Sequence, residues 1–121
     1  GTGGGAIAAF RAAGVTPVPP VTGNDSELAA AQRIVSGDQY NTISKPIRIV
    51  AEAAADIAWQ FAQGQRPEGS TTLFDTPTDL FEPTVVTIEN LQEVLVESGE
   101  LSLEDICTAE YAAACAANGL S

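Results

Sequence analysis

The chain of 121 residues is long enough for one ordinary domain and too short for two sizeable ones. Its net charge of −11 arises in residues 67–121, which hold eleven acidic side chains and no basic one, whereas residues 1–66 hold five of each. This charge argues against nucleic acid and against an anionic membrane surface as partners, since both require a basic patch. The acidic part is interpreted as a solvated surface, with a docking face for a basic partner as the alternative.

The first part of the chain predicts two helices joined by a loop. Residues 1–14 are typical of a glycine-rich turn that opens a short helix. Three prolines exclude a regular helix over residues 15–23. A second helix is expected to begin at a capping residue, Asp25 or Ser26, and to end at Gly37.

The middle of the chain predicts a strand, a long helix and a second strand. Residues 39–44 form a β-prone run that Pro46 halts. Residues 47–63 have helical periodicity. Their apolar stripe is formed by Ile47, Val50, Ala54, Ile57, Ala58 and Phe61. Residues 71–74 suggest one short strand within a long connection, and the β-branched run 84–88 predicts another strand.

The last part predicts three short helices. Residues 90–97 read as helical, Ser102 and Asp105 have the spacing of a capping box, and Thr108 is expected to cap a final helix that ends at Asn118. Because strands and helices alternate along the chain, the fold class is α/β.

Cys107 and Cys115 are the only cysteines, and the chain has no histidine. Two cysteines without histidine make a poor zinc site, so no metal is expected and a disulfide is the preferred interpretation. On one unbroken helix their separation of eight residues would span about 12 Å, too far for a disulfide. A bonded pair therefore requires a turn between them, and it favours an oxidising compartment.

Three segments could bind a ligand. The glycines of residues 1–5 could cradle an anion, but they match neither a P-loop nor a dinucleotide pattern, so a plain turn is preferred. Asp25 could accept hydrogen bonds from a ligand or could simply cap a helix. Lys45 is the only lysine and could be a ligand donor or an ordinary exposed side chain. One helix and one strand separate Asp25 from Lys45, so both could lie at one edge of a sheet and suit a polyhydroxylated ligand.

Enzymatic constellations are scarce. The sequence has no histidine base, no metal-binding cluster and no paired carboxylates at a catalytic spacing, so neither catalysis nor a cofactor is expected. A Schiff-base lyase built on Lys45 is retained only as a minor hypothesis. Trp59 could stack on a sugar ring, but its position beside the apolar stripe favours core packing.

The run "VTGNDSELAAAQRIVSGDQYNTISKPIRIVAEAAADIAWQFAQGQ" resembles the C-terminal part of type I periplasmic sugar-binding proteins, especially their xylose-binding branch. The matching positions are Gly23, Asp25, Ser26, Glu27, Thr42, Lys45, Pro46 and Ile47. Residues 1–14 look like the segment after an Asn-Asp pair in the same family, and residues 84–99 resemble its last crossing between lobes. The resemblance implies a partial type I periplasmic-binding-protein fold that spans pieces of both Rossmann-like lobes.

In this family two lobes close on a sugar and deliver it to the permease of an ABC transporter. The resemblance implies that Asp25 accepts hydrogen bonds from sugar hydroxyls, that Lys45 donates one, and that Asn24, where relatives often have glutamine, is a minor contact. It also implies hinge residues, which are Ser44, Pro46, Glu82 and Pro83. The ligand would be an aldose such as xylose, and the protein would be periplasmic or extracellular and tethered to the membrane.

The resemblance divides the chain into three segments. Residues 1–45 would belong to the C-terminal, sugar-binding lobe, and residues 46–80 would return to the N-terminal lobe. Residues 81–121 would make the last hinge crossing and a helical extension. The alternative function is the sugar-sensing core of a LacI-type transcriptional regulator, which shares this fold but works in the cytosol, where disulfides are rare.

The resemblance also predicts how the 121-residue chain behaves alone. Such proteins are about 300 residues long, so apolar faces that pack on absent strands would be exposed and would favour association. We expect the chain to bind the missing N-terminal portion of the same protein or to self-associate. Size-exclusion chromatography with light scattering tests this expectation, and a stable, monodisperse monomer would contradict it.

Overall fold

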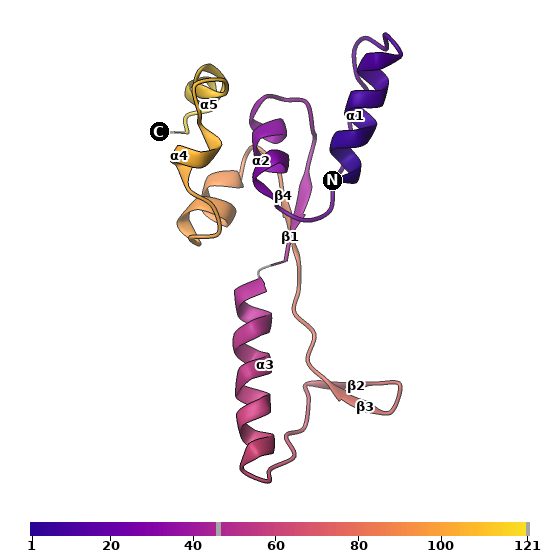
Figure 1. Cartoon of the computed structure of the whole chain (residues 1–121), viewed down its shortest axis with the longest axis vertical. Helices are drawn as coiled ribbons and strands as arrows, with labels where there is room; N and C mark the ends of the chain where they lie inside the picture. Colours follow the sequence, from indigo (N-terminus) through magenta and orange to yellow (C-terminus); the bar gives the residue numbers. More distant parts are fainter. Residues whose placement is uncertain (46, 121) are drawn as a thin grey trace. The chain divides into compact units, whose positions relative to one another are not determined.

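The computed structural model describes residues 1–45 and 47–120 and divides the chain into two compact units. Unit 1 comprises Gly1–Lys45 and Thr84–Ser121, and unit 2 comprises Pro46–Pro83 (Figure 1). The chain thus leaves unit 1 after Lys45, which is also the first expected boundary. It returns after Pro83, three residues later than the second expected boundary. The assignment of these segments to lobes stays a prediction, and Pro46 lies outside the described residues.

Unit 1 begins with helix α1 (Thr2–Ala12), which contains three of the four glycines of the opening run. The expectation of a glycine-rich turn before the helix is therefore wrong. Close packing explains two of these glycines, because a Cβ on Gly3 would lie 3.0 Å from the carbonyl oxygen of Thr22, and one on Gly4 would lie 2.9 Å from the guanidinium of Arg33. The predicted stop at Gly14 is confirmed by its positive φ of 71°.

The second helix, α2 (Leu28–Val35), starts later than predicted. Its N-cap is Glu27, which makes no side-chain capping bond, so neither Asp25 nor Ser26 caps this helix. The helix ends as expected before Gly37, whose φ is 78°. Four of its eight residues are buried: Ala30, Ala31, Ile34 and Val35.

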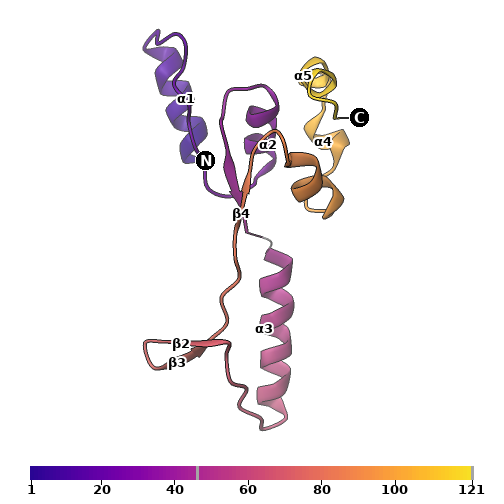
Figure 2. The same cartoon turned by 180° about the vertical axis from the view of Figure 1, so that it is seen from behind.

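Strands β1 (Thr42–Ser44) and β4 (Thr84–Val86) form an antiparallel pair in unit 1. Thr42 faces Val86 and Ser44 faces Thr84, and both views of the chain show the two strands side by side (Figures 1 and 2). Residues 22 and 41 add one parallel bridge. Both strands are shorter than their β-prone runs, but the α/β class is confirmed.

The C-terminal part of unit 1 contains three short helical elements. Residues 92–97 form a π-helix, η1 (Gln92–Glu97), where an ordinary helix was expected. In α4 (Leu103–Ile106) the Ser102 hydroxyl accepts the Asp105 N–H at 3.1 Å, as a capping residue should. The last helix, α5 (Ala112–Ala117), has Tyr111 and not Thr108 at its N-cap position.

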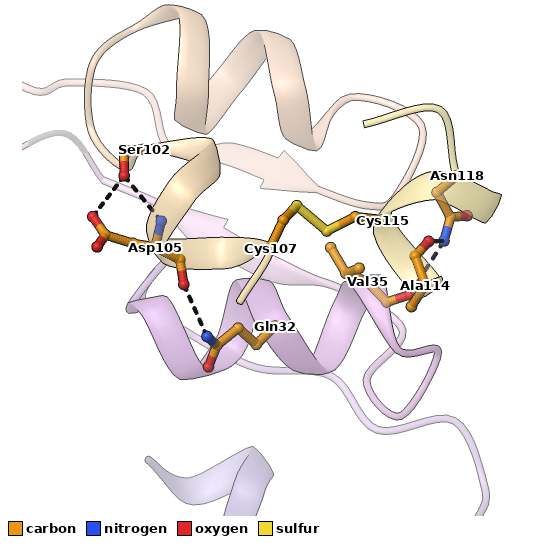
Figure 3. Close-up of a disulfide and its surroundings, with 8 residues drawn as sticks. All are labelled: Gln32, Val35, Ser102, Asp105, Cys107, Ala114, Cys115 and Asn118. Atoms are coloured by element: carbon orange, nitrogen blue, oxygen red, sulfur yellow. Dashed lines mark hydrogen bonds between the residues drawn. A yellow bond between two sulfur atoms is a disulfide. The ribbon is translucent and has the colours of Figure 1, made fainter. Parts of the chain in front are cut away.

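A disulfide joins Cys107, directly after α4, to Cys115 in α5 (Figure 3). The chain turns between the two helices, as a bonded pair requires. Two long-range hydrogen bonds hold this region on α2: Gln32 donates to the Asp105 carbonyl at 3.1 Å, and Asn118 donates to the Val35 carbonyl at 3.2 Å. The C-terminal helices are therefore an integral part of unit 1.

The core of unit 1 lies where α2, β4 and the C-terminal helices meet. Its fully buried side chains include Val86, Leu91, Leu95 and Ile106, which pack with the buried residues of α2 and with Cys115. Residues from the two ends of the sequence thus share one apolar cluster, and its burial is the main stabilising term for this unit.

Unit 2 consists of helix α3 (Ile47–Ala62) and a hairpin of β2 (Thr71–Leu73) and β3 (Thr76–Thr78). The sequence predicted α3 and β2 but missed β3. The turn residues Phe74 and Asp75 have φ values of 51° and 60°, a backbone typical of tight hairpins that is usually signalled by Asn-Gly or Asp-Gly.

The apolar stripe of α3 is present but unburied, since no residue that the structure describes in this helix is buried. The expected core packing of Trp59 is wrong for this chain, because 69% of its surface is exposed. Unit 2 thus presents apolar side chains to solvent, as the predicted association of the chain requires.

The disulfide gives a prediction for the stability of unit 1. Replacing both cysteines (Cys107→Ser with Cys115→Ser) should lower the free energy of unfolding by about 2–3 kcal/mol, because the unfolded chain regains the freedom of the closed loop. Urea unfolding followed by circular dichroism measures this difference. Wild-type protein kept in reductant should match the variant, and equal unfolding midpoints for the oxidised protein and the variant would contradict the prediction.

Candidate functional site

The structure brings Asp25 and Lys45 together. Asp25 lies in the loop before α2 and Lys45 directly follows β1, and the Lys45 ammonium lies 2.7 Å from Asp25 Oδ1. The two side chains are 69% and 48% exposed respectively. Such an exposed ion pair stabilises a fold by at most about 1 kcal/mol, so both groups can be drawn to a ligand at little cost.

The backbone at Asp25 is held in an unusual conformation. Its φ of 75° lies in the left-handed region, which aspartate tolerates better than most residues. The Thr42 hydroxyl donates to the Asp25 carbonyl at 2.6 Å, which fixes this turn against β1. Because Asp25 lies before the N-cap of α2, the helix-cap interpretation is wrong and the carboxylate is free of that task.

Gly23 permits the close packing below this turn. A Cβ at Gly23 would lie 2.3 Å from the Gln39 side-chain nitrogen and 3.0 Å from the Thr42 hydroxyl. The buried Gln39 has no freedom to move aside, because its amide donates to the Asn41 carbonyl and accepts from Arg33, both at 2.9 Å. The match of Gly23 to the family motif therefore has a steric reason.

A cleft of about 510 Å³ lies beside the turn, within the size range of small-molecule sites. Its lining is mixed polar and apolar and includes Thr2, Gly3, Thr22, Asn24, Asp25 and Arg33. Of the predicted contacts, Asn24 and Asp25 therefore lie on the cleft, whereas Lys45 does not line it and is connected to it through its ion pair with Asp25.

The cation in this cleft is already compensated. Arg33 donates to Gln39 and lies 3.6 Å from Glu27, and its side chain is mostly buried. Paired in this way, Arg33 makes the cleft better suited to a neutral polar ligand than to an anion.

Sequence reasoning missed Arg33 and Gln39. Arg33 looks like an ordinary residue of an amphipathic helix, and Gln39 looks like the first residue of the β-prone run. Their role appears only in the folded chain, where Gly23 packs on Gln39 and Arg33 donates a hydrogen bond to Gln39. The match of Gly23 to a motif was the one available signal that something lies close to its backbone.

Of the four expected hinge residues, Pro46 lies outside the described residues, and the other three lie where the chain passes between the units. Ser44 ends β1 and pairs with Thr84 at the start of β4, and Glu82 and Pro83 directly precede β4. Both crossings therefore meet at one strand pair. A hinge motion about these residues stays a prediction.

Within residues 1–45 and 47–120, no three side chains of histidine, cysteine, aspartate or glutamate cluster in a way that could hold a metal ion. None of the helices in these ranges is long and apolar enough to cross a membrane.

The sequence model of the periplasmic binding protein domain matches residues 1–66, over half of the chain. The chain therefore belongs to the periplasmic binding protein family. It is 37% identical over 102 residues to the D-xylose-binding periplasmic protein of Escherichia coli, covering 81% of this chain and 31% of the relative. With the protein of the same name from Haemophilus influenzae it is 35% identical over 109 residues, covering 87% and 33%.

A solved structure agrees with these relatives. The carbohydrate transporter solute-binding protein of Chloroflexus aurantiacus, in complex with D-glucose, superposes with a TM-score of 0.72 at 31% identity. The match covers 82% of this chain and 30% of that protein. The chain thus spans about a third of the length of the relatives that it matches.

The packing at Gly23 yields a prediction. Gly23→Ala should lower the free energy of unfolding by about 1–3 kcal/mol, because the new methyl group overlaps the fixed Gln39 amide. Gly5→Ala in α1 is the matched control, since its Cβ would meet nothing within 4 Å and should raise helix stability by about 0.5–1 kcal/mol. Urea unfolding of both variants measures the difference. Equal stability of Gly23→Ala and wild type would show that the turn relaxes freely.

Proposed function

We propose that the chain is part of the solute-binding component of an ABC sugar importer. In this proposal the protein binds an aldose, xylose or a close relative, in the cleft between two lobes and delivers it to the permease. The observation that carries the proposal is the Asp25–Lys45 pair beside a cleft of mixed polar and apolar lining, at positions that match the family motif.

The chemistry of the pair suits a sugar. Each sugar hydroxyl can donate one hydrogen bond and accept others, so one hydroxyl can donate to the Asp25 carboxylate while it or its neighbour accepts from Lys45. Hydrogen bonds to charged groups stabilise a complex by about 1.5–3 kcal/mol each. Because water screens the exposed ion pair, a sugar that inserts there exchanges a weak contact for stronger ones.

The relatives support an aldose as the ligand. Two relatives are named for D-xylose, and the superposed structure holds D-glucose. Xylose and glucose share the pyranose ring and its equatorial hydroxyls and differ by one hydroxymethyl group. A site built for the shared hydroxyls would accept both, so the choice between them rests on residues that contact the sixth carbon.

The proposed cycle uses the two crossings between units. Residues 1–45 would supply one wall of the cleft and residues 46–80 would belong to the other lobe. Bending near Ser44, Pro46, Glu82 and Pro83 would close the lobes, and a sugar that binds the closed form better would shift the population toward it. The permease would then recognise the closed form.

A periplasmic or extracellular location, with a membrane tether, is part of the proposal. The relatives are named as periplasmic proteins, and the Cys107–Cys115 disulfide suits an oxidising compartment. The same disulfide disfavours the LacI-type regulator, which would work in the cytosol. The names of the relatives describe binding and transport, so the proposed role is not enzymatic.

The test is calorimetric titration of a protein of the relatives' full length that contains this chain. Wild type should bind xylose or glucose, and Lys45→Ala should weaken the affinity at least about tenfold, or roughly 1.4 kcal/mol, through the lost donor. Arg11→Ala is the matched control, because it also removes an exposed cation paired with a carboxylate, but its partner Asp38 does not line the cleft as Asp25 does.

Two results would count against the proposal. If no aldose bound to the wild type in titration or shifted its melting temperature, the transport function would fail. If wild type bound but Lys45→Ala bound equally well, the function would stand and Lys45 would be removed from the site.

A further inference from the structure

The carboxylate of Glu100 connects the two arms of the candidate site, which are the segment that carries Asp25 and the segment that carries Lys45. The Ser26 hydroxyl donates to Glu100 Oε1 at 2.7 Å, and the Ser44 hydroxyl donates to Glu100 Oε2 at 2.9 Å. Ser26 directly follows Asp25, and Ser44 directly precedes Lys45. We propose that Glu100 is a positioning residue for sugar binding, which holds Asp25 and Lys45 at the separation that the ligand requires.

Burial makes these two hydrogen bonds important. Ser26 is 8% exposed and Ser44 is 1% exposed, so neither hydroxyl can exchange Glu100 freely for bulk water. Hydrogen bonds to an ionised acceptor are stronger and better directed than neutral ones. A single carboxylate with two oxygens can satisfy both hydroxyls at once, which fixes the distance between the segments that carry them.

The contacts form a closed circuit. Asp25 is bonded along the chain to Ser26, Ser26 contacts Glu100, Glu100 contacts Ser44, and Lys45 returns to Asp25 through the 2.7 Å ion pair. Without Glu100, the two side chains would be held by the exposed ion pair, the Thr42 contact and the backbone hydrogen bond from Gly23 to Asn41. The carboxylate therefore adds a link between two buried serines, one in each arm.

The backbone around Glu100 is suited to a fixed role. Gly99 has a φ of 76° after η1, and the Leu101 N–H donates to the Leu95 carbonyl at 2.8 Å, which closes the turn around Glu100. Leu95 is fully buried in the core. Glu100 thus extends from a turn anchored in the core, while its own side chain remains accessible at the surface.

The inference gives the C-terminal part of the chain a role in ligand binding, and it rests on the proposed function. Glu100→Ala, in a protein of the relatives' full length that contains this chain, should weaken aldose affinity about tenfold, within the usual range of coupling between sites. Glu100→Gln should bind within about threefold of wild type, since its amide can accept from one serine and donate to the other. Calorimetric titration with xylose and glucose measures both variants.

Two controls separate positioning from stability. Glu97→Ala removes the same charge from the same segment, at a side chain with no hydrogen bond to Ser26 or Ser44 in the part of the chain that the structure describes, and should leave affinity unchanged. The Cys107→Ser, Cys115→Ser variant lowers the free energy of unfolding through residues that follow the Glu100 turn in the chain, and it should also leave affinity unchanged. If Glu100→Ala melted at a lower temperature yet bound the sugar as wild type does, Glu100 would be structural only and the inference would be overturned.

Two further measurements keep the test decisive. If Glu100→Ala failed to fold, Ser44→Ala would take its place, because it removes only one of the two hydrogen bonds to Glu100. This variant should still weaken binding severalfold, and unchanged affinity would overturn the inference. If wild type bound no aldose, the proposed function would fail by itself, and amide hydrogen exchange in the 121-residue chain would decide the inference. Faster exchange at residues 24–26 and 43–45 in Glu100→Ala than in Glu97→Ala supports positioning, and equal exchange refutes it.

Discussion

The antiparallel pairing of β1 with β4 is the constraint on which unit 1 depends. It places Ser44 opposite Thr84, so the segments that lead into and out of unit 2 lie side by side in Figures 1 and 2. Thr42 and Val86, which face each other at the other end of the pair, are fully buried. Closing such a long loop has an entropic cost, but this cost grows only slowly with loop length, so a small buried strand pair can hold the loop closed.

The side chains proposed to contact a ligand, Asp25 and Lys45, are both held in place by this strand pair. Lys45 follows β1 directly, and the Thr42 side chain holds the carbonyl of Asp25, which brings the loop before α2 to the end of the strand. The Gly23 turn packs on Gln39 and Thr42 for the same reason. The site therefore depends on how one strand end and one loop are held together, by the 2.6 Å hydrogen bond from Thr42 to Asp25 and by the packing of Gly23.

The acidic part of the chain does more than keep the protein in solution. Asp105 accepts from the capping residue Ser102, and Glu100 accepts from two buried serines near the candidate site. Asp79 accepts the Ser70 N–H in the hairpin of unit 2, which lowers the pKa of its carboxyl. Other acidic side chains, such as Glu68 and Glu110, lie exposed at the surface, where the solvated interpretation fits them.

The sequence by itself determined the local elements. Gly14, Gly37 and Gly64 mark helix ends, and the α/β class follows from the order of helical and β-prone runs. These features depend on neighbours a few residues apart, so their signals are local. The proximity of Asp25 and Lys45 was also predictable from the sequence, because one helix and one strand separate them and a family motif marks both.

The tertiary structure alone decided which residues support that pair. Glu100 contacts Ser26 and Ser44, which lie 74 and 56 residues away along the chain, and no local pattern marks such partners. The glycines of α1 looked like a turn because close packing against Thr22 and Arg33 leaves no trace in periodicity. The hairpin strand β3 and the exposure of Trp59 were missed for a related reason, since turn backbone and burial depend on what else packs nearby. Local sequence thus determined most of the helices and strands, and long-range packing determined the geometry of the site.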